Sequence, residues 1–329
     1  MRVIQEHNIL LHQNIDSSLQ SQQWGLVIGN FDGVHLGHQH YLQHVQRGCE
    51  ALGIGILLLT FRPHTYLAIK GPIHNFLLNS YEEKILQMQE LTDKGIIKID
   101  CLLEIAFDKD VRCFRYEEFV TKVLLSRINI KKMFFGYDFA IGVNRNGSLD
   151  SLKKHLQQKK ILYEEITLFS RGTTIYSSSK VREYINKGDL AAANKILGRE
   201  FYLSGVVVKK KQLGGKIGIP TANVAIDEVR AIPKSGVYVT LFEYAGKKYP
   251  SVTSVGTNPT VESTLDIKIE THIFDFHQDI YDKNVSVHFI DWIREEKKFT
   301  SIDELIKIIS SDIAIAKKYF LNQSPIINS

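Results

Sequence analysis

The residues Leu26–Tyr41, LVIGNFDGVHLGHQHY, constrain the fold of this chain more than any other stretch. A short apolar run, Leu26–Ile28, predicts a buried strand. A tight turn with glycines at positions 29 and 33 follows, and the residues His38–Arg47 predict a helix. A strand, a glycine turn and a helix start in this order present backbone N–H groups and the positive end of the helix dipole to one anion. The stretch therefore predicts an α/β unit with a phosphate-binding turn.

Two imidazoles stand at this turn. His35 and His38 are three residues apart, where the turn gives way to the helix. Imidazoles at this point can donate hydrogen bonds to charge that develops on a phosphate. A structural role near a helix start and a metal pair are the alternatives, and the metal pair has no third ligand at a suitable spacing. We favour the phosphate site because the sixteen residues together are a far more specific pattern than the glycine turn or the histidines alone.

Length and composition bound the class of protein. A chain of 329 residues predicts two domains, and 44% hydrophobic with 23% charged residues is typical of a globular protein. A net charge of +5 suits anionic substrates and does not require nucleic acid. Three widely spaced cysteines favour a reducing compartment, and no apolar run is long enough for a signal peptide or a membrane span. We expect a cytoplasmic protein, monomeric or weakly homo-oligomeric, that binds small molecules rather than nucleic acid or membranes.

The first part of the chain alternates strands with helices. Gly53–Phe61 is an unbroken apolar run, which is typical of a parallel strand covered on both faces. Asn79–Asp93 has helical spacing behind a capping Ser80. Alternating strands and helices predict a parallel, Rossmann-like α/β domain, for which we expect the bounds 1–186.

The character of the chain changes beyond about residue 200. Short, β-branched and often alternating segments, separated by turn residues, predict a closed antiparallel barrel. The spacing over Ser301–Phe320 then predicts a C-terminal helix. We expect this second domain to span residues 187–329.

Four patches in the first domain carry a family resemblance. They are GNFDGVHLGH, TFRPHTYL, FGYDFAIGVNRNG and SSSKVR. The first resembles the nucleotide-binding motif of the nucleotidylyltransferase superfamily. All four, in this order, resemble the FAD synthetase module of the bacterial bifunctional riboflavin kinase/FAD synthetases. Two departures stand out, because Thr65 replaces a proline of the family pattern and Ser179 replaces a threonine.

The resemblance implies adenylyl transfer, in which the phosphate of FMN attacks the α-phosphate of ATP and pyrophosphate leaves. It implies that His35 and His38 are catalytic and stabilise the transition state. The further ATP- and phosphate-contacting residues that it implies are Gly29, Asn30, Asp32, Gly33, Ser178, Ser179 and Arg182. The residues that it implies for flavin and nucleotide contacts are Asp138, Arg62 and His64. Taken alone, SSSKVR fits a serine-capped helix start with surface cations better, and His64 fits a structural role equally well.

The second domain carries a further resemblance. LSGVVVKKKQLGGKIGIPTANV, residues 203–224, resembles the flavokinase module, with Gly215 in place of an arginine and Ile219 in place of a phenylalanine. Thr221 and Asn223 are two residues apart on one extended face, so both can point at one Mg²⁺–ATP. The residues that the resemblance implies for ATP and phosphate are Gly205, Gly214, Gly218, Lys216 and Asn258.

Glu270 is the expected general base of the kinase reaction. It lies in an apolar strand, IETHIFDF, where burial can raise the pKa of a carboxyl. Alternation alone favours an outward-facing strand residue, and the resemblance favours catalysis. Trp292, Arg294 and Phe299 fall in a segment that resembles the flavin-covering part of the family, although core packing fits Trp292 equally well.

The sequence as a whole predicts a bifunctional transferase. The barrel would phosphorylate riboflavin to FMN, and the α/β domain would adenylylate FMN to FAD, each with ATP and Mg²⁺. Two alternatives stay open. One is a riboflavin kinase whose adenylyltransferase domain is weakened, and the other is a non-catalytic regulator that binds flavin or nucleotide.

Overall fold

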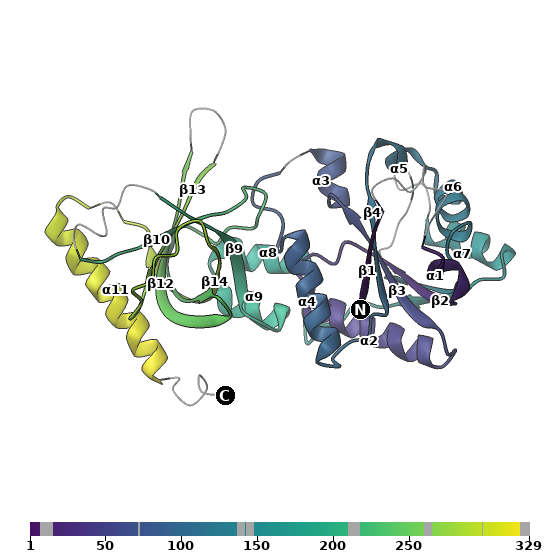
Figure 1. Ribbon diagram of the computed structural model, residues 1–329, viewed down its shortest axis with the longest axis horizontal. Helices are drawn as coiled ribbons and strands as arrows, with labels where there is room; N and C mark the ends of the chain where they lie inside the picture. The colour runs from purple at the N-terminus through teal and green to yellow at the C-terminus, as the bar shows by residue number, and fades with distance from the viewer. Residues whose placement is uncertain are drawn as a thin grey trace. The chain divides into compact units, whose positions relative to one another are not determined.

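The computed structural model describes residues 1–6, 16–71, 73–136, 142, 148–209, 218–259, 265–297 and 299–322. The chain forms two compact units, and their segments can be located in Figure 1 by the colours, which follow the residue number. The first unit comprises Met1–Ile73 and Ser80–Ser177, and the second comprises His74–Asn79 and Ser178–Ser329. The expected division at residues 186 and 187 stays a prediction about independently folding domains.

A parallel sheet forms the centre of the first unit. Among the described residues it has six strands in the order β1-β4-β3-β2-β5-β6, and every neighbouring pair is parallel. Its strands are β1 (Arg2–Glu6), β2 (Trp24–Ile28), β3 (Gly55–Arg62), β4 (Cys101–Ala106), β5 (Ile130–Gly136) and β6 (Leu162–Ile166). The predicted parallel α/β fold is confirmed. The strand order reverses between β2 and β5, and open α/β sheets bind ligands at such a reversal.

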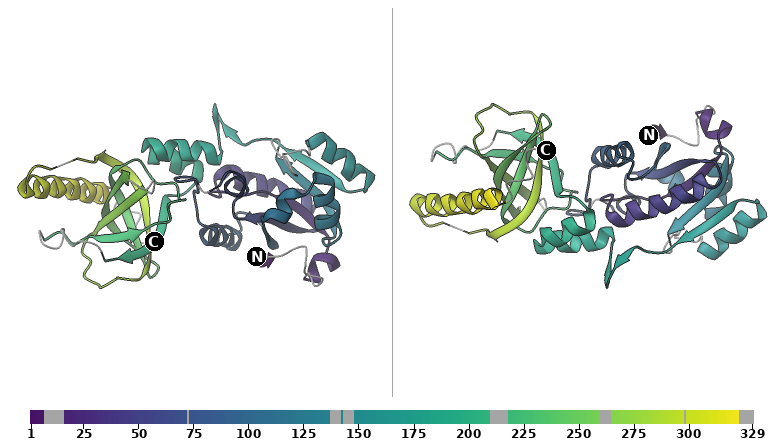
Figure 2. Two further views of the ribbon diagram at one scale, coloured as in Figure 1. Left: turned by 90° about the horizontal axis from the view of Figure 1, so that it is seen from above. Right: turned by 90° about the horizontal axis from the view of Figure 1, so that it is seen from below.

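Helices cover both faces of this sheet, as the two views in Figure 2 show. The helical segments are α1 (Ser18–Ser21), α2 (Leu36–Glu50), α3 (Thr65–Lys70), α4 (Tyr81–Asp93), α5 (Lys109–Cys113), α6 (Tyr116–Glu118), the π-helical η1 (Phe119–Leu125) and α7 (Leu149–Gln158). On one face Val27 packs with Leu42 of α2 and Met88 of α4. On the other face Leu26 packs with Leu152 of α7. Burial on both faces explains why the strands show unbroken apolar runs.

The predicted helix over 79–93 begins two residues later, as α4. Ser80 caps it, because its hydroxyl accepts from the Glu83 N–H while the Glu83 carboxylate accepts from the Ser80 N–H. This reciprocal capping box satisfies two N–H groups that the first turn would otherwise leave unpaired. A small hairpin, β7 (Ser170–Arg171) and β8 (Thr174–Ile175), closes the first unit.

The second unit is built around a closed antiparallel barrel, as predicted. Its strand order is β10-β13-β12-β11-β14-β9, and pairing of β9 with β10 closes it. The strands are β9 (Phe201–Val208), β10 (Ala222–Ala225), β11 (Gly236–Tyr244), β12 (Lys247–Pro259), β13 (Leu265–Ile273) and β14 (Asn284–Glu295). Two helices precede the barrel, α8 (Ser178–Lys187) and α9 (Leu190–Leu197). Within the described ranges, pairing of β13 with the short β10 is limited to Thr271 and Glu270, so closure of the barrel depends on few backbone contacts at this seam.

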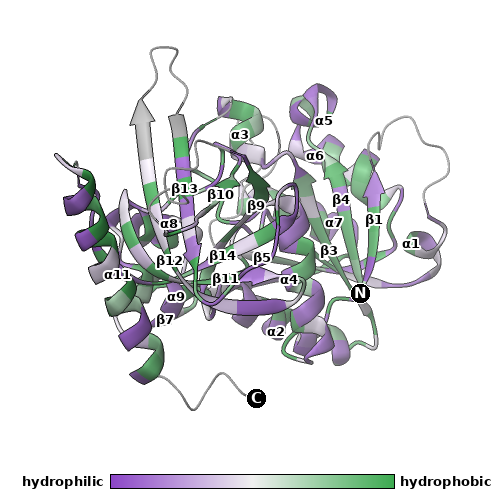
Figure 3. Cartoon of the chain, turned by 60° about the vertical axis from the view of Figure 1, so that its left-hand side comes forward, coloured by the Kyte–Doolittle hydropathy of each residue, from purple (hydrophilic) through white to green (hydrophobic). Residues whose placement is uncertain are grey.

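The predicted C-terminal helix is α11 (Ile302–Asn322), which packs on the outside of the barrel. Ala316 and Phe320 of the helix contact a cluster that includes Val237, Val239 and Val252. Figure 3 shows hydrophobic and hydrophilic residues alternating around this helix, as expected where one face is buried and the other is solvated.

Candidate functional site

The turn after β2 lies at the carboxyl end of the strand where the sheet order reverses. Three of its residues have positive φ, with 51° at Phe31, 83° at Gly33 and 41° at Val34. Positive φ is unfavourable for a residue with a β-branched side chain such as valine, so the surrounding structure must hold this conformation. Phe31, Asp32 and Val34 are all buried. The turn therefore has a fixed shape, as a preformed anion site requires.

The two predicted histidines lie together at the start of α2. His35 is the N-cap, and its Nδ1 accepts a hydrogen bond from the backbone N–H of His38 at 3.2 Å. An Nδ1 that accepts leaves the proton of the neutral ring on Nε2. The rings of His35 and His38 stack with centroids 3.6 Å apart, and Phe31 contacts the His38 ring at 5.1 Å. The structure therefore places both imidazoles in one fixed arrangement.

Gly37, which the sequence analysis did not single out, makes this arrangement possible. A Cβ at this position would lie 2.6 Å from the carbonyl oxygen of Tyr176 and 2.9 Å from Nδ1 of His35. Real Cβ atoms do not approach other heavy atoms so closely, so only glycine fits between the two histidines without a shift of the His35 ring. The signal in the sequence was the glycine between two histidines in HLGH.

His38 is held as a neutral imidazole. Burial lowers the pKa of His38 well below its usual value of 6.5, and the charges of His35 and Lys84 lower it further. Its Nδ1 is buried and has no hydrogen-bond partner within the described part of the chain. A neutral ring can still donate a hydrogen bond from its protonated nitrogen without introducing a buried charge.

Lys84 is the main charged residue that the sequence analysis missed. It comes from α4, is 6% exposed, and its Nζ donates to the Asn30 carbonyl oxygen at 3.2 Å and to Thr60 Oγ1 at 2.9 Å. Burial lowers the pKa of Lys84 to about 8, although the charge of Asp32 acts in the opposite direction. A lysine four residues before the buried Met88 lies on the core-facing side of the helix, and this spacing was the available signal.

Asn30 is held by Thr65, the residue that replaces the family proline. The Asn30 Nδ2 donates to Thr65 Oγ1 at 2.9 Å, and the Thr65 backbone N–H donates to Asn30 Oδ1 at 3.3 Å. Next to it, His64 caps α3, because its Nδ1 accepts from the Tyr66 N–H at 3.2 Å. The predicted ligand contact of His64 stays a prediction beside this observed structural role.

The remaining predicted residues of the first domain lie in different places. Arg62, at the end of β3, is exposed, forms an ion pair with Glu82 at 3.1 Å and lies over the Tyr81 ring at 4.8 Å. Gly29 ends the strand, and a Cβ there would lie 2.9 Å from the Phe31 ring. Asp138 lies outside the described residues; β5, which pairs with β2, ends two residues earlier in the chain at Gly136.

The serine patch begins α8 and belongs to the second compact unit. Ser178 is the first helical residue and is half-buried, and Ser179 follows it and is exposed. The Arg182 Nε donates to the Phe76 carbonyl oxygen at 2.6 Å, and its guanidinium lies 4.0 Å from the Phe76 ring centre. The phosphate contacts expected of these three residues stay predictions.

The kinase residues lie side by side on the barrel wall. Asn223 of β10 is paired in register with Glu270 of β13, and Glu270 is paired with Ser254 of β12. Residues directly opposite each other in a sheet share a face. The Asn223 Oδ1 is buried and has no hydrogen-bond partner among the residues that the structure describes. An unsatisfied oxygen beside a carboxylate is the kind of donor set that a hard cation prefers.

His272 secures the PTAN segment. Its Nδ1 lies 2.8 Å from the carbonyl oxygen of Pro220, which can only accept, so this nitrogen carries the proton. Thr221 follows directly and borders a pocket of about 340 Å³. The other residues around this pocket are Pro220, Ala222, Thr271, Ile273, Phe276, His277, Gln278, Asp279, Ile280 and Tyr281. A cavity of this size can hold part of a nucleotide or flavin.

Several glycine-loop residues fall outside what the structure describes. Gly214 and Lys216 lie outside the described residues, as does the side chain of Asn258. Gly218 has φ 78°, which favours glycine. At Gly205 a Cβ would overlap the carbonyl oxygen of Ala225, so close pairing of β9 with β10 is a structural reason for this glycine.

The predicted flavin residues include one that is already paired. The Arg294 guanidinium forms two hydrogen bonds to the buried Asp312 of α11, at 2.9 and 2.7 Å. Trp292 packs edge-to-face on Tyr238 at 5.1 Å, and a Cβ on Gly236 would meet its ring. Phe299 is half-buried. Packing and helix attachment are thus the observed roles, and flavin contact stays a prediction.

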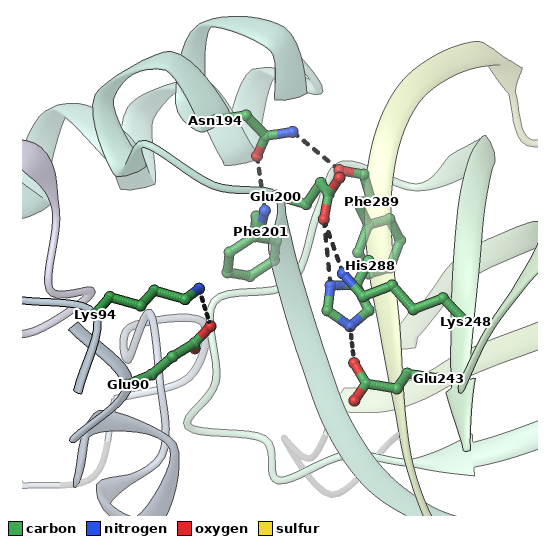
Figure 4. A network of polar contacts seen from close by, with 9 residues as sticks. All are labelled: Glu90, Lys94, Asn194, Glu200, Phe201, Glu243, Lys248, His288 and Phe289. Carbon is green, nitrogen blue, oxygen red and sulfur yellow. Dashed lines mark hydrogen bonds and ion pairs between the residues drawn. The ribbon is translucent and has the colours of Figure 1, made fainter. Parts of the chain in front are cut away.

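A histidine network that the sequence did not indicate stabilises the barrel wall (Figure 4). The Nε2 of buried His288 lies 2.7 Å from a Glu243 carboxylate oxygen, and its Nδ1 lies 3.7 Å from Glu200. Lys248 pairs with Glu200 at 3.2 Å. The hydrogen bond from His288 lowers the pKa of Glu243. The network joins β11, β12 and β14 to the start of β9.

Comparison with known proteins assigns both units to one family. The FAD synthetase family model matches residues 18–180, and the riboflavin kinase family model matches residues 197–320. The bifunctional riboflavin kinase/FMN adenylyltransferase of Buchnera aphidicola subsp. Schizaphis graminum is 33% identical over 297 residues, which cover 89% of this chain and 93% of that protein. This chain belongs to the bifunctional riboflavin kinase/FMN adenylyltransferase family.

Other members and a solved structure support this assignment. The bifunctional riboflavin kinase/FMN adenylyltransferase of Escherichia coli K12 is 31% identical over 94% of this chain and 97% of its own length. A crystal structure named a macrolide-efflux protein from Streptococcus pneumoniae has a TM-score of 0.80 and 26% identity, and the match covers 96% of this chain and 99% of that one. The activity in that name, macrolide efflux, refers to the Streptococcus pneumoniae protein and not to this chain. In the part of this chain that the structure describes, no helix is long and apolar enough to cross a membrane.

Proposed function

We propose that this riboflavin kinase/FMN adenylyltransferase makes FAD at the turn after β2, with His35 and His38 as the catalytic pair. The observation that carries the proposal is the stacked histidine pair at the start of α2, with burial lowering the pKa of His38, at the point where the sheet order reverses. ATP and FMN are the substrates. The site needs to position them and to neutralise charge, because phosphate displacement demands little covalent chemistry from a protein.

In this reaction an oxygen of the FMN phosphate attacks the α-phosphorus of ATP. A new P–O bond forms, the bond to the bridging oxygen of the β-phosphate breaks, and pyrophosphate leaves. His35 and His38 donate hydrogen bonds to the α-phosphate oxygens as negative charge grows on them. The helix N-terminus and the N–H groups of the glycine turn at Gly29 and Gly33 add to this stabilisation.

The other residues of the adenylyltransferase site have supporting roles. Asn30 and Asp32 shape the turn, Arg62 and His64 approach from the neighbouring strand end, and Asp138 faces a ribose or Mg²⁺. Ser178, Ser179 and Arg182 hold the β- and γ-phosphates at the start of α8. The assignment of Asp138 rests on the family resemblance alone, and the others rest on the resemblance together with the positions described above.

We propose that the barrel phosphorylates riboflavin with Glu270 as general base. The riboflavin 5′-hydroxyl oxygen attacks the γ-phosphorus of ATP, the bond to the β-phosphate oxygen breaks, and the hydroxyl proton passes to the Glu270 carboxylate. ADP is the leaving group. The position of Glu270 beside Asn223 supports this role.

Mg²⁺ fits the residues that are present beside Glu270. The Thr221 hydroxyl and the buried Asn223 Oδ1, which has no hydrogen-bond partner among the described residues, would hold the ion. When bound, Mg²⁺ supplies charge to the transferring phosphoryl group. Gly205, Gly214, Lys216, Gly218 and Asn258 line the path of the phosphates in this proposal. Trp292 and Phe299 cover the flavin, and Arg294 attaches α11 to this end of the barrel.

The chain is further proposed to work as a monomer or weak homo-oligomer in the cytoplasm. Its three cysteines are free thiols, and Cys49 and Cys101 are buried. Free thiols fit a reducing compartment. Sedimentation of the purified protein over a range of concentrations would reveal its oligomeric state.

The test is a chromatographic time course of flavins in two parallel reactions. One contains riboflavin, ATP and Mg²⁺, and the other contains FMN, ATP and Mg²⁺. The wild type should form FMN first and FAD later in the first reaction, and FAD in the second. His38→Asn should stop at FMN, whereas Glu270→Gln should convert supplied FMN to FAD but leave riboflavin unchanged.

Each alternative gives a different pattern. A weakened adenylyltransferase would accumulate FMN in the wild type and would lose little more in His38→Asn. A flavin- or nucleotide-binding regulator would bind riboflavin without consuming ATP. Consumption of two ATP per FAD formed from riboflavin excludes the regulator.

A further inference from the structure

Lys84 occupies an unusual position for a lysine. It is 6% exposed, although it stands in the first two turns of α4, a helix with several exposed charged residues. Lysine is rarely buried unless its charge meets specific partners, because removal of the ammonium group from water is costly. A buried lysine therefore needs an explanation beyond the packing of its aliphatic stem.

The contacts of the ammonium group tie three elements together. Nζ donates to the hydroxyl of Thr60, near the end of β3, and to the backbone carbonyl of Asn30, the first residue of the turn. Asn30 directly precedes Phe31, which has a positive φ. The ammonium group thus fixes the entrance of the strained turn that leads to the histidine pair.

The surrounding charges act on the same group. Asp32 attracts it, Arg62 repels it, and the Tyr81 ring lies 4.8 Å from Nζ. The charge of Lys84 also lowers the pKa of His38, as a smaller cause than burial and the charge of the stacked His35. Lys84 therefore acts on the site both through a hydrogen bond to the turn and through its charge.

We propose that Lys84 is a positioning residue for adenylyl transfer, which holds in place the Asn30 turn that leads to the His35–His38 pair. The inference rests on the proposed role of His38 in FAD formation. Lys84 does not touch substrate in this proposal. It keeps the turn in its strained conformation through its hydrogen bonds to Asn30 and Thr60. Its charge adds to the burial and the charge of His35, which are the larger causes of the lowered pKa of His38.

The test uses the full-length protein and three variants. Lys84→Met removes the charge and the hydrogen bonds while it keeps the aliphatic stem. Lys84→Gln removes the charge and keeps a donor. Lys94→Met is the matched control, because Lys94 is at the end of the same helix and pairs only with exposed Glu90 in the described structure. FMN formation reports whether the barrel of each variant remains folded. Urea unfolding followed by Trp24 fluorescence in a Trp292→Phe background reports on the unit that contains Lys84.

Two readouts separate positioning from general stability. Lys84→Met should lower kcat/KM for FAD formation from supplied FMN by about 10²-fold, and Lys84→Gln by less, because misplacement of a catalytic group by about 1 Å has effects of that size. NMR of histidines labelled at Cε1 should show a higher titration midpoint for His38 in both variants than in the wild type. Lys94→Met should match the wild type in both readouts.

The inference is overturned if FAD formation by Lys84→Gln stays within about twofold of the wild type, whether or not the His38 resonance moves. If Lys84→Met unfolds the first unit, Lys84→Gln alone decides. Wild-type protein that forms no FAD at all would instead contradict the proposed function, so the two failures are distinguishable.

Discussion

Asn30 and Thr65 hold each other through two hydrogen bonds, from the Asn30 side-chain Nδ2 to the Thr65 hydroxyl and from the Thr65 backbone N–H to the Asn30 side-chain Oδ1. A proline, which the family pattern has at this position, could supply neither group. Threonine in place of proline therefore adds two hydrogen bonds to the turn that precedes the histidine pair. Thr65 is also the first residue of α3, where proline is well tolerated in helices.

Substitution of Thr65 by proline tests whether these bonds support activity. We expect Thr65→Pro to fold, to keep FMN formation, and to lose FAD formation several-fold because the turn is held less firmly. Thr65→Val, which keeps the N–H, should lose less. Steady-state rates with supplied FMN measure both variants. A several-fold gain in Thr65→Pro would instead favour the alternative in which Thr65 weakens the adenylyltransferase.

The Thr65 contact also shows where prediction from the sequence stops. Apolar runs such as Leu26–Ile28 and Gly53–Phe61 predicted the sheet, because strands buried on both faces show no alternation. The histidine pair was predictable because a strand, a glycine turn and a helix start lie within sixteen residues. The departure at Thr65 was visible, but its partner was not, because Asn30 lies 35 positions away.

Long-range partners explain the other differences as well. Lys84 reaches Asn30 across 54 positions, and nothing in its local pattern identifies that carbonyl. Arg294 was expected at the flavin, and its bidentate partner Asp312 lies on α11. Local spacing fixes which face of a helix or strand a residue occupies, but a pair of side chains from two elements depends on how those elements pack.

Gly37→Ala should impair FAD formation specifically. The new methyl group would meet the Tyr176 carbonyl oxygen at 2.6 Å and the His35 ring at 2.9 Å, so the histidine pair must move. A shift of about 1 Å in a catalytic group can cost about 10²-fold in rate. Assays of both half-reactions on one preparation check this. Equal loss of FMN formation would show that the variant damages the fold rather than the site.

His272→Ala should weaken the kinase reaction. The substitution removes the 2.8 Å hydrogen bond from His272 Nδ1 to the carbonyl oxygen of Pro220. Pro220 directly precedes Thr221. We expect a several-fold higher KM for Mg²⁺–ATP in FMN formation and an unchanged rate of FAD formation from supplied FMN. The control is His277→Ala, because His277 is an exposed histidine beside the same pocket and its loss leaves the hydrogen bond to Pro220 in place. An unchanged KM would mean that PTAN is held in place by the barrel strands alone.

Removal of Asp312 should destabilise the barrel. Asp312→Ala leaves Arg294 without its bidentate partner in a partly buried position, and loss of one partner of a buried ion pair costs about 3 kcal/mol. Each compact unit has one tryptophan, Trp24 and Trp292, so urea unfolding of a Trp24→Phe background reports on the barrel. Asp303→Ala, in the exposed first turn of α11, should cost less than about 1 kcal/mol. Equal effects of the two substitutions would contradict the prediction.

Stability at acidic pH should depend on Glu243. The hydrogen bond from His288, the largest cause, lowers the pKa of Glu243 in the folded protein below its ordinary value of 4.5. The unfolded chain then binds this proton more readily, so the contribution is complete above about pH 4.5 and is lost as the pH falls through the folded value. Glu243 is more than one third exposed, so screening by solvent limits the effect to less than about 1 kcal/mol.

The measurement is the urea midpoint of the Trp24→Phe protein as a function of pH, with and without Glu243→Gln. We expect Glu243→Gln to lower the midpoint at neutral pH and to flatten its fall between about pH 5 and pH 3. Glu90→Gln, in the exposed pair with Lys94 on the other unit, should leave the barrel curve unchanged. If Glu243→Gln follows the same acid limb as the unsubstituted protein, the carboxylate between β11 and β14 does not contribute to stability through its charge.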